Sequence, residues 1–132
     1  MLVQAVIAGA SALGLLSWPL SIGSSVSTSL TIILLSAIIL HIFLIMIEVF
    51  GSHSNSHVAT AAHYMRSGRL KYIFWGLFLA PGSLLPIAML CIVLLVPSAQ
   101  PALVAFAGIL ALVGLFAYEH CFVTAGQIVP LS

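Results

Sequence analysis

The segment from Thr28 to Phe50 limits what this chain can fold into more than any other feature, because His41 and Glu48 are its only ionisable residues. A helix needs about 20 mostly apolar residues to cross the roughly 30 Å hydrocarbon core of a bilayer. With 63% hydrophobic and 4% charged residues, the chain has too little polar surface for a water-soluble fold. Backbone groups in lipid must be paired within the protein, which long apolar segments achieve as helices. We therefore predict an all-α integral membrane protein.

Four apolar segments are candidate membrane spans, separated by clusters of Gly, Ser, Pro or His. They cover approximately 2–18, 28–50, 71–96 and 102–125. We expect residues 1–132 to form one up-down bundle of four transmembrane helices. The first segment lacks a preceding basic region and a typical cleavage site, so we interpret it as a span and not as a signal peptide.

The connection between the second and third spans, Gly51 to Gly68, is the only long one. Its second part predicts a short interfacial helix, with Ser56 as a candidate N-cap and Gly68 as a candidate C-terminal stop. The basic residues of the chain lie at or just beyond the end of this connection: Arg66, Arg69 and Lys71. Because basic connections stay on the cytoplasmic side, we expect a multi-pass protein of the cell (inner, cytoplasmic) membrane with both termini in the cytoplasm.

Small residues and prolines predict where the helices approach one another. Small side chains recur at helical spacing in the fourth span, which predicts a face packed on a neighbouring helix. This face contains Ala107, Ala111, Gly114 and Tyr118. In the third span Pro81, Gly82 and Pro86 should free backbone carbonyls and bend the helix toward protein or water. Such a break is either a packing kink or the lining of a site, and the sequence leaves both open.

Four Glu and His side chains lie in the predicted spans. They are His41, Glu48, Glu119 and His120. Ionisable groups in a membrane are costly and therefore need a reason, and a column of Glu and His is typical of a proton path. We therefore take these residues as candidates for proton conduction. The alternative is that Glu48 is an interfacial carboxylate in water and that Glu119 and His120 anchor a partner helix.

Other chemistries receive less support. Three basic residues are too few for nucleic-acid binding. Cys91 and Cys121 lie in apolar helices without CxxC spacing, so we expect neither a disulfide nor a metal site there. A metal held by the loop histidines is a weak alternative, since no Cys or carboxylate accompanies them: His53, His57 and His63. Haem b between His41 and His120 is a second alternative, although their estimated depths differ by about 6 Å.

Three stretches resemble one known family. They are "HIFLIMIEVFGSHSNSHVATAAHYMRSG", "FWGLFLAPGSLLPIAML" and "AYEHCFVTAGQIVPLS". In order and spacing they are similar to the NrfD/polysulfide-reductase membrane-subunit family, in which an "AGQ" followed by a proline closes the last core helix. The resemblance covers roughly Thr31 to Ser132 and corresponds to the second, C-terminal four-helix half of that family.

The resemblance implies a quinone-linked (menaquinone) membrane subunit, in which the four candidate residues would conduct protons or tune a nearby quinone. It implies a ferredoxin-like iron–sulfur partner that carries the clusters, often a molybdopterin-type catalytic subunit, and here a second membrane chain that supplies the other helical bundle. Many family members place an arginine near the position of Glu119, so the proton path is an inference from position and chemistry and is not inherited.

Three hypotheses follow. In the first, the chain is a subunit of a quinone-dependent respiratory complex that binds no redox cofactor itself and helps to exchange electrons and protons. In the second, it is a structural anchor or assembly subunit without chemistry. In the third, it is a haem b anchor.

Overall fold

The computed structural model describes residues 1–20, 23–51, 56–96 and 100–128. Within this part the chain is all α-helical and has no strand. The helices are α1 (Leu2–Ser17), α2 (Ser24–Phe50), α3 (Ser56–Arg66), α4 (Lys71–Ile73), the π-helix η1 (Phe74–Leu84), α5 (Leu85–Leu95) and α6 (Gln100–Ile128). Since α4, η1 and α5 follow one another without a break, they form one long helix from Lys71 to Leu95.

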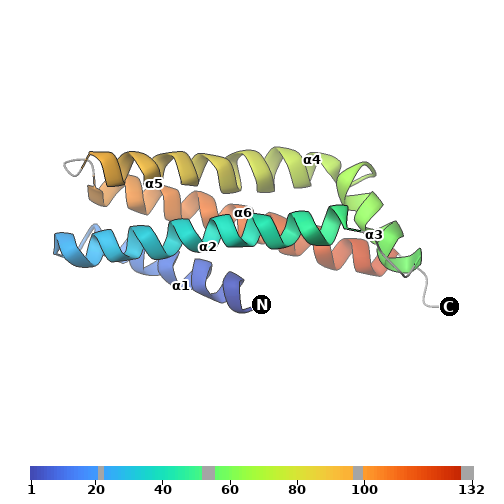
Figure 1. The fold of residues 1–132 in the computed structure, drawn as a ribbon, viewed down its shortest axis with the longest axis horizontal. Helices are drawn as coiled ribbons and strands as arrows, with labels where there is room; N and C mark the ends of the chain where they lie inside the picture. Colours follow the sequence, from blue (N-terminus) through green and yellow to red (C-terminus); the bar gives the residue numbers. More distant parts are fainter. Residues whose placement is uncertain (21–22, 52–55, 97–99, 129–132) are drawn as a thin grey trace.

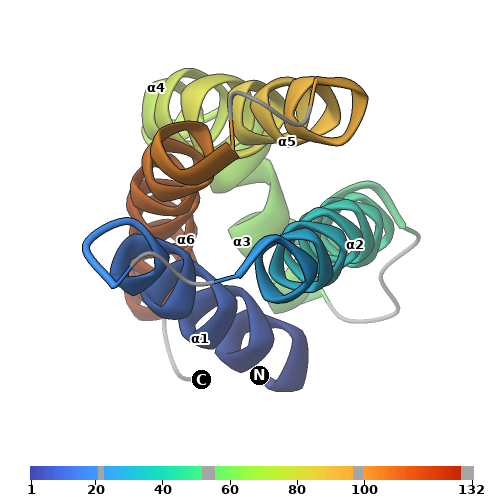
Figure 2. The ribbon, with the colours of Figure 1, turned by 90° about the vertical axis from the view of Figure 1, so that its left-hand side faces the viewer.

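The long helices lie side by side with alternating direction, as predicted for an up-down arrangement (Figures 1 and 2). Helix α3 lies at the end of the bundle where α2 ends and α4 begins (Figure 1). Helix α6 contacts every other element, so it is the centre of the packing. The N-terminus of α1 lies partway along the bundle and not at its end (Figure 1).

Within the described residues, three helices are long and apolar enough to cross a membrane: Ser24–Phe50, Lys71–Leu95 and Ala102–Ile128. This confirms the prediction of apolar helices that fit a multi-pass membrane protein. Helix α1 has 16 residues, which corresponds to a length of about 24 Å and falls short of the roughly 30 Å hydrocarbon core. The first of the predicted spans therefore stays a prediction.

Two helix ends differ from the predicted bounds by three residues or more. Helix α2 begins at Ser24, four residues before the predicted start, and in its first turn Thr28 Oγ1 donates to the Ser24 carbonyl over 2.9 Å. Helix α6 continues through Gly126 to Ile128, three residues beyond the predicted end of the fourth span at residue 125. A Cβ at Gly126 would meet no atom within 4 Å, and nothing there forces the chain out of the helix.

The loop-side helix ends close to its predicted stop. Helix α3 begins at Ser56 itself and ends at Arg66, and the backbone N–H of Gly68 donates to the His63 carbonyl over 3.0 Å. A Cβ at Gly68 would lie 2.8 Å from the Tyr64 Cα, so the chain needs glycine to pass this close.

The predicted small face of α6 is confirmed as a packing surface. Ala107 and Ala111 are 0% and 2% exposed, and Gly114 is buried against Gly82 of η1. Closer to the start of α6, a Cβ at Gly108 would lie 3.0 Å from the Ser11 carbonyl oxygen of α1. The backbones of η1 and α1 therefore approach α6 at glycines, as expected for helices that pack in lipid.

The predicted break in the third span takes the form of a π-helix, in which hydrogen bonds join residues five apart. The Leu85 N–H, for example, donates to the Ala80 carbonyl. Pro81 lies inside η1, and the Ser83 hydroxyl donates to the Phe78 carbonyl over 3.0 Å. The helix is thus widened and not interrupted. Pro81 has no backbone N–H to donate, and the hydroxyl of the nearby Ser83 adds a hydrogen-bond donor to this turn.

Candidate functional site

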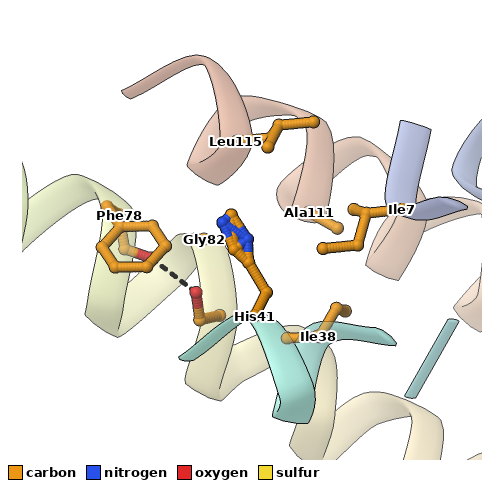
Figure 3. A pocket seen from close by; sticks show the side chains of 8 residues that line it. Ile7, Ile38, His41, Phe78, Gly82, Ala111 and Leu115 are labelled. Atoms are coloured by element: carbon orange, nitrogen blue, oxygen red, sulfur yellow. Dashed lines mark hydrogen bonds between the residues drawn. The ribbon is translucent and has the colours of Figure 1, made fainter. Parts of the chain in front are cut away.

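Helix α2 places His41 in the interior of the bundle. Its side chain is 5% exposed and points toward η1 and α6 (Figure 3). It lies nine positions before Phe50, the last residue of α2, which puts it about 13 Å from the end of the helix. An ionisable ring at this depth in an apolar bundle is the first component of the candidate site.

Two aromatic rings pack against the imidazole of His41. The ring of Tyr118 from α6 meets it edge-on, with 5.2 Å between ring centroids and an interplanar angle of 85°. Phe78 of η1 lies 5.9 Å away and also packs on Tyr118 at 5.4 Å. Among the described residues, neither ring nitrogen of His41 has a hydrogen-bond partner.

Tyr118 connects His41 to Glu48. Its side chain is 4% exposed, and its hydroxyl donates to Glu48 Oε2 over 3.2 Å. His41 and Glu48 lie two turns apart on α2, and the tyrosine spans this separation from the opposite helix. The structure therefore brings together two of the four predicted residues through a third that we had assigned to packing alone.

Sequence reasoning missed the role of Tyr118, although one signal was available. The residue lies one turn after Gly114 on the small face of α6, and a buried phenol usually requires a hydrogen-bond partner. On α2, Glu48 lies seven positions after His41 and therefore on the same helix face, where it is an available hydrogen-bond acceptor.

Glu119 and His120 do not join this group. Glu119 is half-buried and His120 is exposed, while their neighbours Tyr118 and Cys121 are buried. Each step along an α-helix turns by about 100°, so the two residues that follow Tyr118 point away from His41. The predicted column of four residues is thus not one buried group: His41 is buried, Glu48 is exposed near the end of α2 and reaches Tyr118 from there, and Glu119 and His120 lie apart from both.

The outward position of His120 also bears on haem. Two axial ligands of one iron must face a common space, and His41 faces the interior while His120 is exposed. The pair therefore does not present two imidazoles to one haem within this bundle.

The remaining candidates lie elsewhere. His57 and His63 are exposed on α3, and His53 falls outside the described residues. In the described ranges no group of three His, Cys, Asp or Glu side chains could hold a metal ion. Cys91 is exposed and Cys121 is buried, and both are free thiols.

The basic end of the bundle packs on aromatic rings. The Arg66 guanidinium lies over the Phe50 ring at 5.2 Å, and Trp75 Nε1 donates to the Arg66 carbonyl over 2.9 Å. The Lys71 ammonium lies over the Tyr72 ring at 4.9 Å. Aromatic and basic side chains together are typical of a membrane–water boundary, about two turns beyond the level of His41.

Comparisons of the chain with protein-family models, with curated proteins and with solved structures gave no match.

Proposed function

We propose that this chain is a membrane subunit of a quinone-linked respiratory oxidoreductase complex, in which His41, Tyr118 and Glu48 form part of a proton path. The observation that carries the proposal is the hydrogen bond of 3.2 Å from the buried Tyr118 to the exposed Glu48, beside the buried imidazole of His41. Imidazole and carboxylate exchange protons readily, and a phenol hydroxyl can both donate and accept a hydrogen bond. Ionisable groups inside a bundle are costly, and those that persist mark functional pathways.

The sequence resemblance to the NrfD/polysulfide-reductase membrane-subunit family supports the quinone part of the proposal. We propose that all four long elements cross the cell membrane, with α1 as a short span, and that α3 lies at the cytoplasmic interface. In this arrangement both termini face the cytoplasm, where the three basic residues lie. The chain itself carries no redox cofactor.

The same resemblance supplies the proposed partners. A second membrane chain would contribute the other helical bundle, and a quinone such as menaquinone would bind near the junction of the two. A ferredoxin-like subunit would carry the iron–sulfur clusters, and a molybdopterin-type subunit would complete the complex. Glu119 and His120, which lie toward the outside of α6, would contact the second membrane chain.

Tyr118→Phe and Glu48→Gln test the proton path in the whole complex. Tyr118→Phe removes the hydrogen-bond donor, and Glu48→Gln keeps an acceptor oxygen but removes the carboxylate that can take up a proton, each with little change in volume. Proton relays by positioned groups contribute about 10²–10⁴-fold to a rate, so we expect quinol-linked turnover and proton uptake to fall roughly tenfold or more. Tyr72→Phe is the matched control, since Tyr72 is 77% exposed. Turnover and proton uptake at the control level in both variants would refute the path.

A structural anchor is the second candidate, and the outward position of Glu119 and His120 favours it. In that case Glu119→Gln and His120→Gln would reduce the amount of assembled complex, and the Tyr118 and Glu48 variants would leave the turnover per assembled complex unchanged. A Soret band in the purified subunit would instead support a haem b anchor.

A further inference from the structure

A small cavity lies beside His41 at the point where the long elements of the bundle meet (Figure 3). Its volume is about 10 Å³. The lining comes from all four: Ile7 of α1, Ile38 and His41 of α2, Phe78, Gly82 and Ser83 of η1, and Ala111 and Leu115 of α6. A cavity of roughly this size holds one water molecule and no larger ligand.

The walls are apolar except at two side chains. His41 and Ser83 are 5% and 3% exposed, so both are more than nine-tenths buried. The imidazole of His41 points into the cavity, and neither of its nitrogens has a hydrogen-bond partner among the described residues (Figure 3). A neutral imidazole offers one donor and one acceptor, and each is costly to bury alone.

Ser83 presents the complementary group. Its hydroxyl hydrogen is committed to the Phe78 carbonyl over 3.0 Å, so the oxygen retains lone pairs that accept hydrogen bonds. Water is the one small molecule that donates twice and accepts twice. It can donate to the unprotonated nitrogen of His41 and to the Ser83 oxygen at the same time.

We infer that this cavity is a binding site for a single water molecule, held between His41 and Ser83 inside the bundle. The π-helix creates the site, because widening η1 around Pro81 places Gly82 and Ser83 opposite the imidazole. Gly82 contributes no side chain to fill the space, and Ala111 on the facing wall contributes only a methyl group. The role of this water as a proton carrier for His41 rests on the proposed function, whereas its presence does not.

The test uses the full chain in lipid nanodiscs with ¹⁵N-labelled histidine and proton-detected solid-state NMR. Magnetisation transfer from water to the ring nitrogens of His41 is measured in the wild type, and its assignment comes from the loss of signals in His41→Phe. We expect a transfer that identifies a bound water. Its complete absence in the wild type would overturn the inference.

Two variants change the site in different ways. Ala111→Val fills the space and should abolish the transfer, while Ser83→Ala keeps the space and should shift the resonance of the unprotonated His41 nitrogen. Ser17→Ala is the matched control, because Ser17 is also buried and also donates to a backbone carbonyl, that of Gly14 over 2.6 Å. An unchanged transfer in folded Ala111→Val would overturn the inference. If that variant does not fold, an unchanged His41 resonance in Ser83→Ala does so.

These outcomes separate the water site from the proton path. A water signal at His41 combined with normal turnover in the Tyr118 and Glu48 variants would refute the path and retain the site. Impaired turnover in those variants, without a water signal at His41 in the wild type, would refute the water site and retain the proton path.

Discussion

Helices η1 and α6 approach each other closely at Gly82 and Gly114, which makes Gly114→Ala a sharp test of the packing. A Cβ at Gly114 would lie 2.5 Å from the Gly82 Cα and 2.6 Å from the Gly82 carbonyl oxygen. Carbon atoms in good contact are about 3.5–4.0 Å apart. The two backbones would therefore have to separate by roughly 1 Å at the crossing.

The expected magnitude follows from two opposing effects. Overpacking a close contact costs about 1–3 kcal/mol. Replacing glycine by alanine within a helix raises the free energy of unfolding by roughly 0.5–1 kcal/mol, because the unfolded chain has less conformational freedom. We expect Gly114→Ala to lower the free energy of unfolding by about 1–2 kcal/mol.

Other glycines provide a graded set of controls. A Cβ at Gly108 would lie 3.0 Å from the Ser11 carbonyl oxygen, and one at Gly14 would lie 3.2 Å from Val104 Cγ1. At Gly9 it would meet nothing within 4 Å. The predicted order of stability is therefore Gly9→Ala, Gly14→Ala, Gly108→Ala and Gly114→Ala, from highest to lowest.

Unfolding can be followed by thiol labelling during titration of mixed micelles with SDS. Cys121 is 0% exposed and reacts only when the bundle opens, and a Cys91→Ala background removes the exposed thiol. If Gly114→Ala were as stable as Gly9→Ala, the close crossing would not exist in the membrane protein.

Three further substitutions have defined outcomes. Trp75→Phe removes the donor to the Arg66 carbonyl, so amide hydrogen exchange in α3 should accelerate by an amount that corresponds to about 0.5–1.5 kcal/mol. The control Trp18→Phe, at an exposed site, should leave the exchange rate in α3 unchanged. Thr31→Val deletes a buried hydroxyl that bonds only within its own helix, so the free energy of unfolding in the SDS titration should change by less than about 0.5 kcal/mol. His41→Phe replaces the imidazole by an apolar ring and should leave the free energy of unfolding within about 1 kcal/mol of the wild type, yet lower quinol-linked turnover. Large destabilisation by His41→Phe would indicate that the imidazole is mainly structural.

The apolar helices were predictable because their signal is compositional. The runs that became α2, the helix from Lys71 to Leu95 and α6 are long enough to be recognised without any contact information. Helix ends were less predictable, since Ser24 and Gly126 carry turn signals that the local backbone overrides. The break at Pro81 was also visible, but its resolution as a π-helix depends on the fit against α6.

The candidate site was only half predictable for a geometrical reason. Residue number gives the depth of a side chain along a helix, at 1.5 Å per residue, and thus identified His41 as the deepest candidate and placed Glu48 near the end of its helix. It does not give the rotation of the helix about its axis, which is set by the neighbours. Glu119 therefore has a suitable depth but lies toward the outside, while Tyr118, one position earlier, faces inward.

The glycine crossing and the candidate site depend on one another. Phe78 lies one turn before Gly82, and Tyr118 lies one turn after Gly114, so the crossing determines how far apart the two rings are, 5.4 Å between centroids. Those rings hold the imidazole of His41. Because separating the backbones by roughly 1 Å is comparable to the whole tolerance of a hydrogen bond, Gly114→Ala should also disturb the approach of Tyr118 to Glu48. Gly114→Ala, which changes no ionisable group, is therefore expected to lower turnover at SDS concentrations where the bundle is still folded.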